Sequence, residues 1–225
     1  MTNPLDELVQ ATPAKKKSKK LSAREVGCAF CPLNKVPGIK KVKGTVEGKE
    51  IFIWGMAPGP EENKEGREFV GRSGRLLWDE LKIVGITRDM CDIQNVVRCF
   101  PADYNDTEWP PLTMRDPTPE EIHCCSIFTK QAIEFHQAKV HLIFGAVAAK
   151  ALLGVEYKKG KKSFWSDKLN AHVMCLYHPS FFIRQGYGGK VPQAPNSFYK
   201  QWRADFKHAA SLLLSKGQFS YVQLY

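Results

Sequence analysis

Four short runs of apolar residues have the pattern of buried β-strands. They lie at residues 50–55 (EIFIWG), 91–97 (CDIQNVV), 139–145 (KVHLIFG) and 172–178 (HVMCLYH). In each run the apolar residues occupy both faces, which is typical of a parallel strand buried between two layers. We therefore predict a mostly parallel sheet that is covered on both faces.

Segments with helical periodicity separate these strands. One helix is predicted over residues 73–84, and another begins at Thr118, where TPEE supplies an N-cap, a proline in the first turn and Glu121 as capping-box partner. Residues 145–154 predict a short helix, and residues 197–217 predict a long amphipathic one. This alternation indicates an α/β sandwich with helices on both faces of the sheet.

The residues that follow the four predicted strands are chemically unusual. They are glycines or polar side chains, namely Gly55 to Gly59, Asn95, Gly145 and His178. In open α/β sheets, ligands bind beyond the carboxyl ends of the strands. We therefore expect these residues to line one crevice, in which the glycines allow a ligand to approach the backbone closely.

Length and composition fit one folded domain with a basic tail. The chain has 225 residues, of which 43% are hydrophobic, so it can bury one substantial core. We assign this domain to residues 25–225 and a mobile tail to residues 1–24, which contain the basic run AKKKSKK. The tail is either a nonspecific DNA tether or a solvated segment that only aids solubility.

The charge balance favours a polyanionic partner. Lys and Arg number 33 against 23 Asp and Glu, which gives a formal charge of +10 and suits nucleic acid. No apolar run has transmembrane length, and no apolar signal region lies near Met1. We therefore expect a cytoplasmic protein without a membrane partner, which acts as a monomer.

The cysteines suggest a metal centre. Cys28 and Cys31 form a CxxC pair, the spacing at which one turn of backbone presents two thiolates to a metal or cluster. Cys99 follows the second predicted strand, and a fourth ligand is available on the helix that begins at Thr118, from Cys124 or Cys125. Zinc, an iron-sulfur cluster and unligated thiols all fit this pattern.

Five motifs occur in the order and spacing of a known superfamily: CAFCPL, GMAPGPEENKEGREFVGRSGRLL, NVVRCFP, PTPEEIHCC and HPSFFIR. Together they span residues 28–184, and the chain resembles the uracil-DNA glycosylase superfamily, most closely its iron-sulfur branch, family 4. The resemblance implies a three-layer αβα sandwich with a mostly parallel four-stranded sheet. It also implies hydrolytic excision of uracil from single- or double-stranded DNA, which leaves an abasic site.

The same resemblance implies a cofactor. A structural [4Fe-4S] cluster would be held by Cys28, Cys31, Cys99 and Cys125, with Cys124 as the rival fourth ligand. Four thiolate bonds would tie the N-terminal loop to two distant loops.

The resemblance also assigns the base pocket. Phe69 would stack on a flipped uracil, Asn95 would read its Watson-Crick edge, and His178 would stabilise the charge that develops on the leaving base. Taken alone, each of these residues would also fit a structural role. The backbone around the base would come from Gly55, Met56, Ala57, Pro58 and Gly59, and contacts to the DNA backbone from Arg72, Arg75, Ser180 and Arg184.

One departure from the family pattern concerns the attacking water. Family 4 carries a glutamate where this chain has Met56, and a thioether cannot accept a proton. Either another carboxylate acts on the water, for which the candidates are Glu61, Glu62 and Glu65, or the enzyme relies on stabilising a dissociating transition state. We assign the catalytic role to Glu61.

A second departure is the long segment between Cys99 and Pro117. A related branch that crosslinks to the abasic sugar carries a nucleophilic histidine there, whereas this chain has no histidine between residues 100 and 122. We predict no such crosslink. Tyr104 or Trp109 would wedge into the duplex or shape the pocket, unless the segment is only a variable surface loop.

Three alternatives to uracil excision remain open. The enzyme would be a glycosylase retuned for another or modified pyrimidine, which Met56 and the long segment favour. A DNA-binding module that kept the fold without catalysis is the second alternative, although the presence of Asn95, Phe69 and His178 argues against it. The third, outside the superfamily, is a zinc-binding nucleic-acid protein.

Overall fold

A five-stranded sheet forms the centre of the molecule, in the order β2-β1-β5-β7-β6. The computed structural model describes residues 27–105, 107, 112–154, 163–189 and 194–214. The strands are β1 (Ile51–Gly55), β2 (Cys91–Asn95), β5 (Val140–Phe144), β6 (Phe164–Ser166) and β7 (Ala171–Leu176). Neighbours among β2, β1, β5 and β7 pair in parallel, as predicted, whereas β6 pairs antiparallel with β7.

The prediction of four strands was therefore wrong by one. β6 has only three residues, and a strand of that length leaves no hydrophobic period to detect in the sequence. At the opposite edge, β2 makes isolated antiparallel bridges to the preceding chain, between Thr45 and Ile93 and, just beyond the strand, between Lys41 and Cys99. One edge of the sheet is thus covered by the preceding chain, and the other ends in a short strand.

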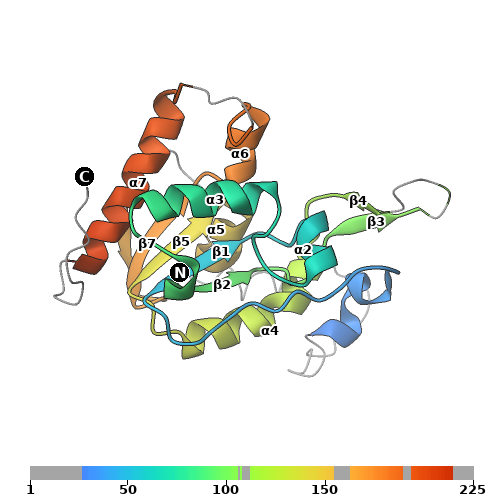
Figure 1. Cartoon of the computed structure of the whole chain (residues 1–225). Helices are drawn as coiled ribbons and strands as arrows, with labels where there is room; N and C mark the ends of the chain where they lie inside the picture. Colours follow the sequence, from blue (N-terminus) through green and yellow to red (C-terminus); the bar gives the residue numbers. More distant parts are fainter. Residues whose placement is uncertain (1–26, 106, 108–111, 155–162, 190–193, 215–225) are drawn as a thin grey trace.

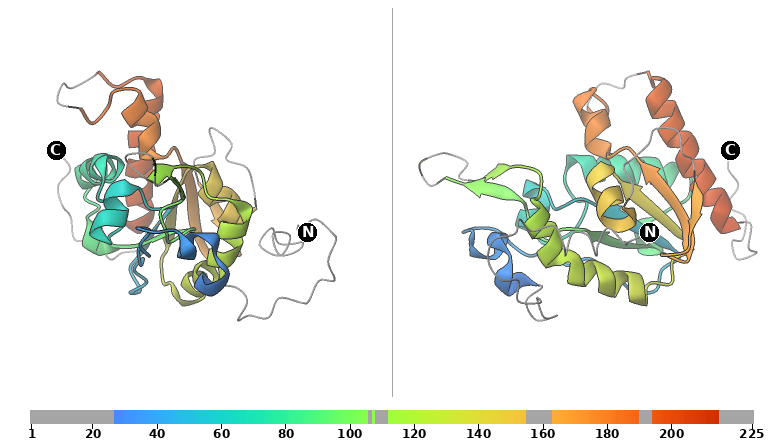
Figure 2. Two further views of the ribbon diagram at one scale, coloured as in Figure 1. Left: turned by 90° about the vertical axis from the view of Figure 1, so that its right-hand side faces the viewer. Right: turned by 180° about the vertical axis from the view of Figure 1, so that it is seen from behind.

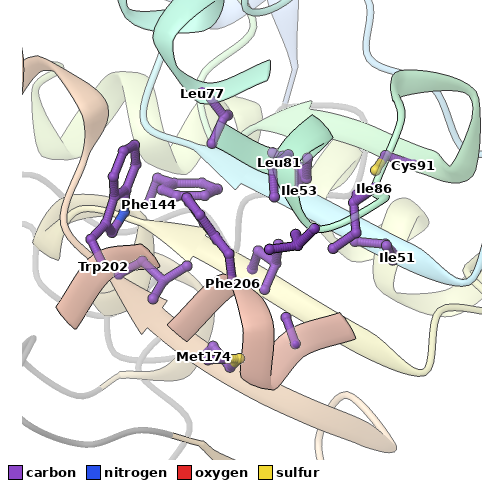
Figure 3. Close-up of a cluster of buried hydrophobic side chains, with 14 of the residues drawn as sticks. Ile51, Ile53, Leu77, Leu81, Ile86, Cys91, Phe144, Met174, Trp202 and Phe206 are labelled. Carbon is purple, nitrogen blue, oxygen red and sulfur yellow. The ribbon is translucent and has the colours of Figure 1, made fainter. Parts of the chain in front are cut away.

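Helices cover both faces of the sheet, which gives the three layers expected (Figure 1). One face packs on α3 (Arg72–Ile83), α6 (Pro179–Arg184) and α7 (Ser197–Leu214), and the other on α4 (Pro119–Phe135) and α5 (Ala146–Leu153). Side chains of β1 alternate between the two cores: Ile51 and Ile53 face α3 and α7, and Phe52 and Trp54 lie in the opposite core. Figure 3 shows the first core, in which Phe206 of α7 lies against the sheet.

The helix boundaries agree with the predicted ones. In α4 the Thr118 side chain accepts a hydrogen bond from the Glu121 N–H at 3.2 Å, and the Glu121 carboxylate accepts one from the Thr118 N–H at 2.8 Å, so the predicted capping box is confirmed. Helix α7 is described as far as Leu214, and its predicted last turn and the basic tail at residues 1–24 lie outside the described residues. No described helix is long and apolar enough to cross a membrane.

A two-stranded hairpin projects from the body (Figures 1 and 2). It consists of β3 (Ala102–Tyr104) and β4 (Leu112–Met114), which pair antiparallel. Arg115 fastens its base to α4, because the guanidinium donates to both carboxylate oxygens of Glu121, at 2.9 and 2.6 Å, and to Asp103 at 2.8 Å. Trp109 lies outside the described residues, whereas Tyr104 is 44% exposed on the hairpin.

The remaining short helices surround the carboxyl ends of the strands or precede the sheet. They are η1 (Cys28–Phe30), η2 (Pro32–Lys35), α2 (Pro60–Glu65) and η3 (Arg88–Met90).

Candidate active site

A cavity of about 420 Å³ opens beyond the carboxyl ends of the strands. The residues that follow the parallel strands line it, as the sequence pattern predicted, together with residues from α2, α3, α5, α6 and the base of the hairpin. Its lining includes Met56, Ala57, Gly59, Glu61, Phe69, Arg72, Asn95, Met114, Asp116, Gly145, His178, Ser180 and Arg184. The predicted convergence of strand ends on one crevice is therefore confirmed for Met56, Ala57, Gly59, Asn95, Gly145 and His178, whereas Gly55 and Pro58 lie outside the lining.

Glu62 holds the loop between β1 and α3 in shape. Its buried carboxylate accepts hydrogen bonds from the backbone N–H groups of Gly59 at 3.0 Å, Val70 at 2.9 Å and Gly71 at 2.7 Å. Three donors occupy most of what a carboxylate can accept, so we assign Glu62 a structural role rather than that of a base for water. Glu65, the other alternative, is exposed at the end of α2 and lies outside the cavity lining.

Phe69 adopts a backbone conformation that bulky residues rarely occupy. Its φ angle is +50°, in the left-handed region, and such strain persists where the surroundings fix it. The Trp78 indole N–H donates to the Phe69 carbonyl at 3.0 Å, and Arg88 donates to the adjacent Glu68 carbonyl at 2.5 Å. A Cβ on Gly74 would lie 2.2 Å from the Phe69 carbonyl carbon, so only glycine allows α3 to pack this closely.

Gly55 permits an equally close approach at the end of β1. A Cβ there would lie 2.0 Å from Asn95 Oδ1 and 2.8 Å from Phe69 Cζ. The amide of Asn95 and the edge of the Phe69 ring therefore meet over this glycine. The glycine-rich stretch that begins at Gly55 brings a ring and an amide together beside the cavity.

Asn95 is held by an acidic residue that the sequence did not single out. The Asn95 amide nitrogen donates to the Glu68 carboxylate, and both side chains are only 3% exposed. Removal from water, reinforced by the nearby Glu62 charge, raises the pKa of Glu68 to about 8. In the sequence, Glu68 resembles any exposed acid of a loop, and only its position next to Phe69 hinted at a role.

The tautomer of His178 follows from its hydrogen bonds. Its Nδ1 accepts from the backbone N–H of Ser180 at 3.2 Å and lies 2.8 Å from the Ser180 hydroxyl. Because a backbone N–H can only donate, Nδ1 carries no hydrogen and Nε2 must carry it. Removal from water and the nearby Arg184 charge lower the pKa of His178 to about 4, so at neutral pH the ring is an uncharged donor.

The predicted cysteines gather around a second, smaller cavity. Cys28, Cys31, Cys99, Cys124 and Cys125 line about 100 Å³ between the N-terminal short helices, the chain after β2, and α4. Burial and then the neighbouring Cys125 raise the pKa of Cys99 to about 12. No three His, Cys, Asp or Glu side chains of the described residues converge as the ligands of a single metal ion do.

Cys124 and Cys125 both interact with Cys31. After burial, Cys31 and Cys28 are the thiols that raise the pKa of Cys125, which is about 11. Its sulfur also accepts the Arg98 backbone N–H at 3.5 Å. Burial, and then Cys31, Glu120 and Cys125, raise the pKa of Cys124 to about 11. Both adjacent cysteines line the cavity, so the structure leaves both as candidates for the fourth ligand.

Comparison with known proteins identifies the family. The sequence profile of the Uracil DNA glycosylase superfamily matches residues 43–206, more than half of the chain. The chain belongs to the uracil DNA glycosylase superfamily. A type-4 uracil-DNA glycosylase of Thermotoga maritima is 33% identical over 174 residues, which cover 73% of this chain and 82% of the relative. Another, of Archaeoglobus fulgidus, is 29% identical over 206 residues, 84% of this chain and 90% of the relative.

Two exposed arginines stand at the mouth of the cavity in this superfamily member. Arg72 and Arg184 are exposed and line it, and Arg184 donates to the Ser180 hydroxyl at 3.3 Å. Arg75, the fourth residue predicted to contact DNA, is exposed on α3 outside the lining and donates to the Val70 carbonyl at 3.0 Å.

Two cavity residues come from the long segment that distinguishes this chain from the family pattern. Met114, at the end of β4, and Asp116 line the cavity, so the base of the hairpin shapes the site. Sequence reasoning placed the segment beside the pocket but named neither residue. Among the side chains that line the cavity, Met56 carries no charge, whereas Glu61 and Asp116 are carboxylates.

Proposed function

We propose that this protein removes uracil from DNA by hydrolysing the N-glycosidic bond, which leaves an abasic site. The observation that carries the proposal is the convergence of Phe69, Asn95 and His178, from three separate elements, on one cavity in a member of this superfamily. The relatives named type-4 uracil-DNA glycosylases support the choice of uracil.

A uracil flipped out of the duplex fits the donors and acceptors of the cavity. Phe69 offers an aromatic surface for stacking, and the Asn95 amide offers an acceptor for the N3–H of uracil and a donor for its O4. Backbone groups from Gly55 to Gly59 close around the base, with Met56, Ala57 and Pro58 between them. Cytosine presents a donor at the same position as O4 and would meet the Asn95 N–H unfavourably.

His178 assists departure of the base. As the bond between the sugar and N1 breaks, its electron pair stays on the base, and the negative charge spreads to the carbonyl oxygens. The hydrogen on His178 Nε2 can be donated to one of them. A neutral ring suits this role because it donates without first transferring a proton.

A cavity carboxylate completes the reaction with water. The water oxygen bonds to the sugar carbon, and its proton passes to the carboxylate. We assign this role to Glu61, with Asp116 as the second candidate, because both line the cavity whereas Met56 cannot accept a proton.

A [4Fe-4S] cluster fits the cysteine cavity. We propose that Cys28, Cys31, Cys99 and Cys125 would hold it, which is supported by their common cavity and by the mutual effects of their thiols. When bound, the cluster would supply four iron–thiolate bonds that cross-link the N-terminal segment, the chain after β2, and α4.

DNA would lie across the positive mouth of the cavity. Arg72, Arg75 and Arg184 would contact phosphates, and Ser180 would bridge Arg184 to the catalytic histidine. Single- and double-stranded substrates both leave a flipped base accessible. A DNA substrate fits the cytoplasmic location and the monomer expected from the sequence.

The test is single-turnover excision from an oligonucleotide with one central uracil, followed by alkaline cleavage. We expect His178→Ala and Asn95→Ala each to lower the rate at least about a hundredfold, because each removes a charge-stabilising or base-reading donor. Glu134→Gln, which changes an exposed acid on α4, serves as the control and should leave the rate unchanged. No excision by cluster-loaded wild-type protein would refute the proposal.

A modified pyrimidine is the second candidate substrate. Met114 and Asp116 from the hairpin reach the cavity, and together with Met56 they give it a lining that the family pattern does not predict. The same assay with oligonucleotides that carry pyrimidines modified at position 5 would identify such a preference, seen as faster release than from uracil.

A further inference from the structure

Glu68 and Asn95 form a buried pair that the proposed reaction does not yet use. The Asn95 amide nitrogen donates to Glu68 Oε2, and each residue is 3% exposed. The other carboxylate oxygen, Oε1, is buried without a hydrogen-bond partner among the described residues. A buried acid with an unsatisfied oxygen lowers stability, which suggests a role in function.

The bond restricts the orientation of the Asn95 side chain. An amide carries its oxygen and its nitrogen on opposite sides and can be turned over with almost no change in shape. An ionised carboxylate accepts hydrogen bonds but cannot donate, so it pairs with the nitrogen side only. One hydrogen of the Asn95 nitrogen is thereby committed to Glu68, which leaves the second hydrogen and Oδ1 for a base.

The two orientations of the amide would read different bases. Oδ1 opposite N3 and the N–H opposite position 4 match uracil, which has a donor at N3 and an acceptor at O4. The inverted amide would match cytosine, which has an acceptor at N3 and a donor at N4. An asparagine without an orienting partner would therefore discriminate poorly between the two pyrimidines.

We propose that Glu68 is a positioning residue that fixes the Asn95 amide in the orientation that reads uracil and excludes cytosine. The inference rests on the proposed function for its consequence at the base, although the pairing itself does not depend on it. Glu68 does not line the cavity, so it acts through Asn95 and not on the substrate.

The protonation state of Glu68 should determine how firmly its carboxyl group orients the Asn95 amide. Its pKa is about 8, raised by burial and by Glu62, while Arg98 and Arg88 on the neighbouring segments oppose the rise. A protonated carboxyl group can also donate, so it would tolerate the inverted amide. The hold on Asn95 should therefore strengthen as the pH rises through about 8.

The first experiment measures discrimination. Single-turnover excision is measured above pH 8, where Glu68 is ionised. Oligonucleotides with one uracil or one cytosine at the same position are compared for wild type, Glu68→Gln and the control Glu134→Gln. A glutamine side chain has nearly the same shape but can either donate or accept. We expect the ratio of uracil to cytosine excision to fall about tenfold or more in Glu68→Gln and to stay unchanged in the control. An equal loss on both substrates, or no loss, would overturn the proposal.

The second experiment needs neither activity nor a variant at Glu68. Protein labelled with ¹⁵N at asparagine is titrated from pH 6 to pH 10, and the Asn95 side-chain NH₂ signals are identified by their absence in Asn95→Ala. We expect these signals to shift with a midpoint near 8, whereas other asparagine side chains do not. Signals that do not respond would refute the pairing. If the pairing is observed and wild type excises no uracil, the proposed function fails and the structural inference stands.

Discussion

At the scale of single residues, the site depends on close approaches that only particular side chains allow. Gly55 leaves room for the Asn95 amide and the Phe69 ring, and Gly74 leaves room for the Phe69 carbonyl. Phe69 keeps a strained backbone because Trp78 and the neighbouring loop fix it. Strain of this kind is stored where function requires a defined geometry.

Substitution of Gly74 should displace Phe69. In Gly74→Ala the new Cβ would lie 2.2 Å from the Phe69 carbonyl, so either α3 or the loop must move. We expect a loss of about 1–3 kcal/mol in the free energy of unfolding, together with at least about tenfold slower uracil excision. Denaturant unfolding and single-turnover kinetics measure the two effects. Gly189→Ala, where a Cβ meets only the Gly186 carbonyl oxygen at 3.4 Å, is the control, and an equal effect there would contradict the argument.

Glu68 should make stability depend on pH. The pKa of an unfolded glutamate is about 4.3, whereas that of folded Glu68 is about 8, so between these values the folded state binds one more proton than the unfolded state. Its contribution to the free energy of unfolding must therefore decrease as the pH rises from about 4.3 to about 8. We expect wild type to lose stability relative to Glu68→Gln across this window, as measured by denaturant unfolding at several pH values. A constant difference between the two proteins would rule out the raised pKa.

At the scale of elements, one guanidinium joins the hairpin to α4. Arg115 contacts both Glu121, whose side chain is fully buried, and Asp103 of β3. The Glu121 carboxylate also caps α4, so hairpin and helix share one charged group. Because Met114 and Asp116 at the base of the hairpin line the cavity, this ion pair connects helix packing to the shape of the site.

Loss of Arg115 should therefore be costly. Arg115→Met leaves the Glu121 charge buried without its partner, and we expect a loss of about 3 kcal/mol in the free energy of unfolding. The double variant Arg115→Met, Glu121→Gln removes the buried charge as well and should recover part of that loss. A double-mutant cycle by denaturant unfolding gives the coupling energy, and additive effects would show that the two side chains do not interact.

At the scale of the whole molecule, the cysteine cavity joins the N-terminal 3-10 helices to the body of the protein. Short 3-10 helices carry Cys28 and adjoin Cys31, whereas Cys99 and Cys125 belong to the body. Only three residues, 96–98, separate Asn95 at the base pocket from Cys99 at this cavity. The two sites therefore share one short piece of backbone.

Substitution of Cys124 and of Cys125 should show which of the two adjacent cysteines is a cluster ligand. We expect Cys125→Ala to abolish the brown visible absorption of an iron-sulfur cluster and to lower the melting temperature markedly, whereas Cys124→Ala retains the colour. Iron analysis and visible spectra of the purified variants decide between them. If only Cys124→Ala loses the colour, Cys124 and not Cys125 is the fourth ligand. If purified wild type is colourless and contains zinc, the site binds zinc and not an iron-sulfur cluster.

Most of the architecture was predictable because long elements impose a period on the sequence. The four parallel strands, α4 with its capping box, and the crevice at the strand ends were all predicted. The three-residue strand β6 was not predicted, since it is too short to show an alternation of apolar and polar residues. The roles of Glu68 and Asp116 were not predicted for another reason. The burial and orientation of a side chain depend on distant segments, and an acid in a loop has the same local sequence pattern whether it faces water or an asparagine.

The edges of the sheet have a consequence for how the protein behaves in a crowded solution. An exposed strand with free N–H and C=O groups can pair with another chain and start aggregation. Here β2 is shielded by backbone hydrogen bonds from Val42 to Arg98 at 2.7 Å and from Thr45 to Ile93 at 2.8 Å. The other edge ends in β6, whose three residues are too few to template a partner. The edges of the central sheet therefore offer little free backbone on which another chain could add a strand.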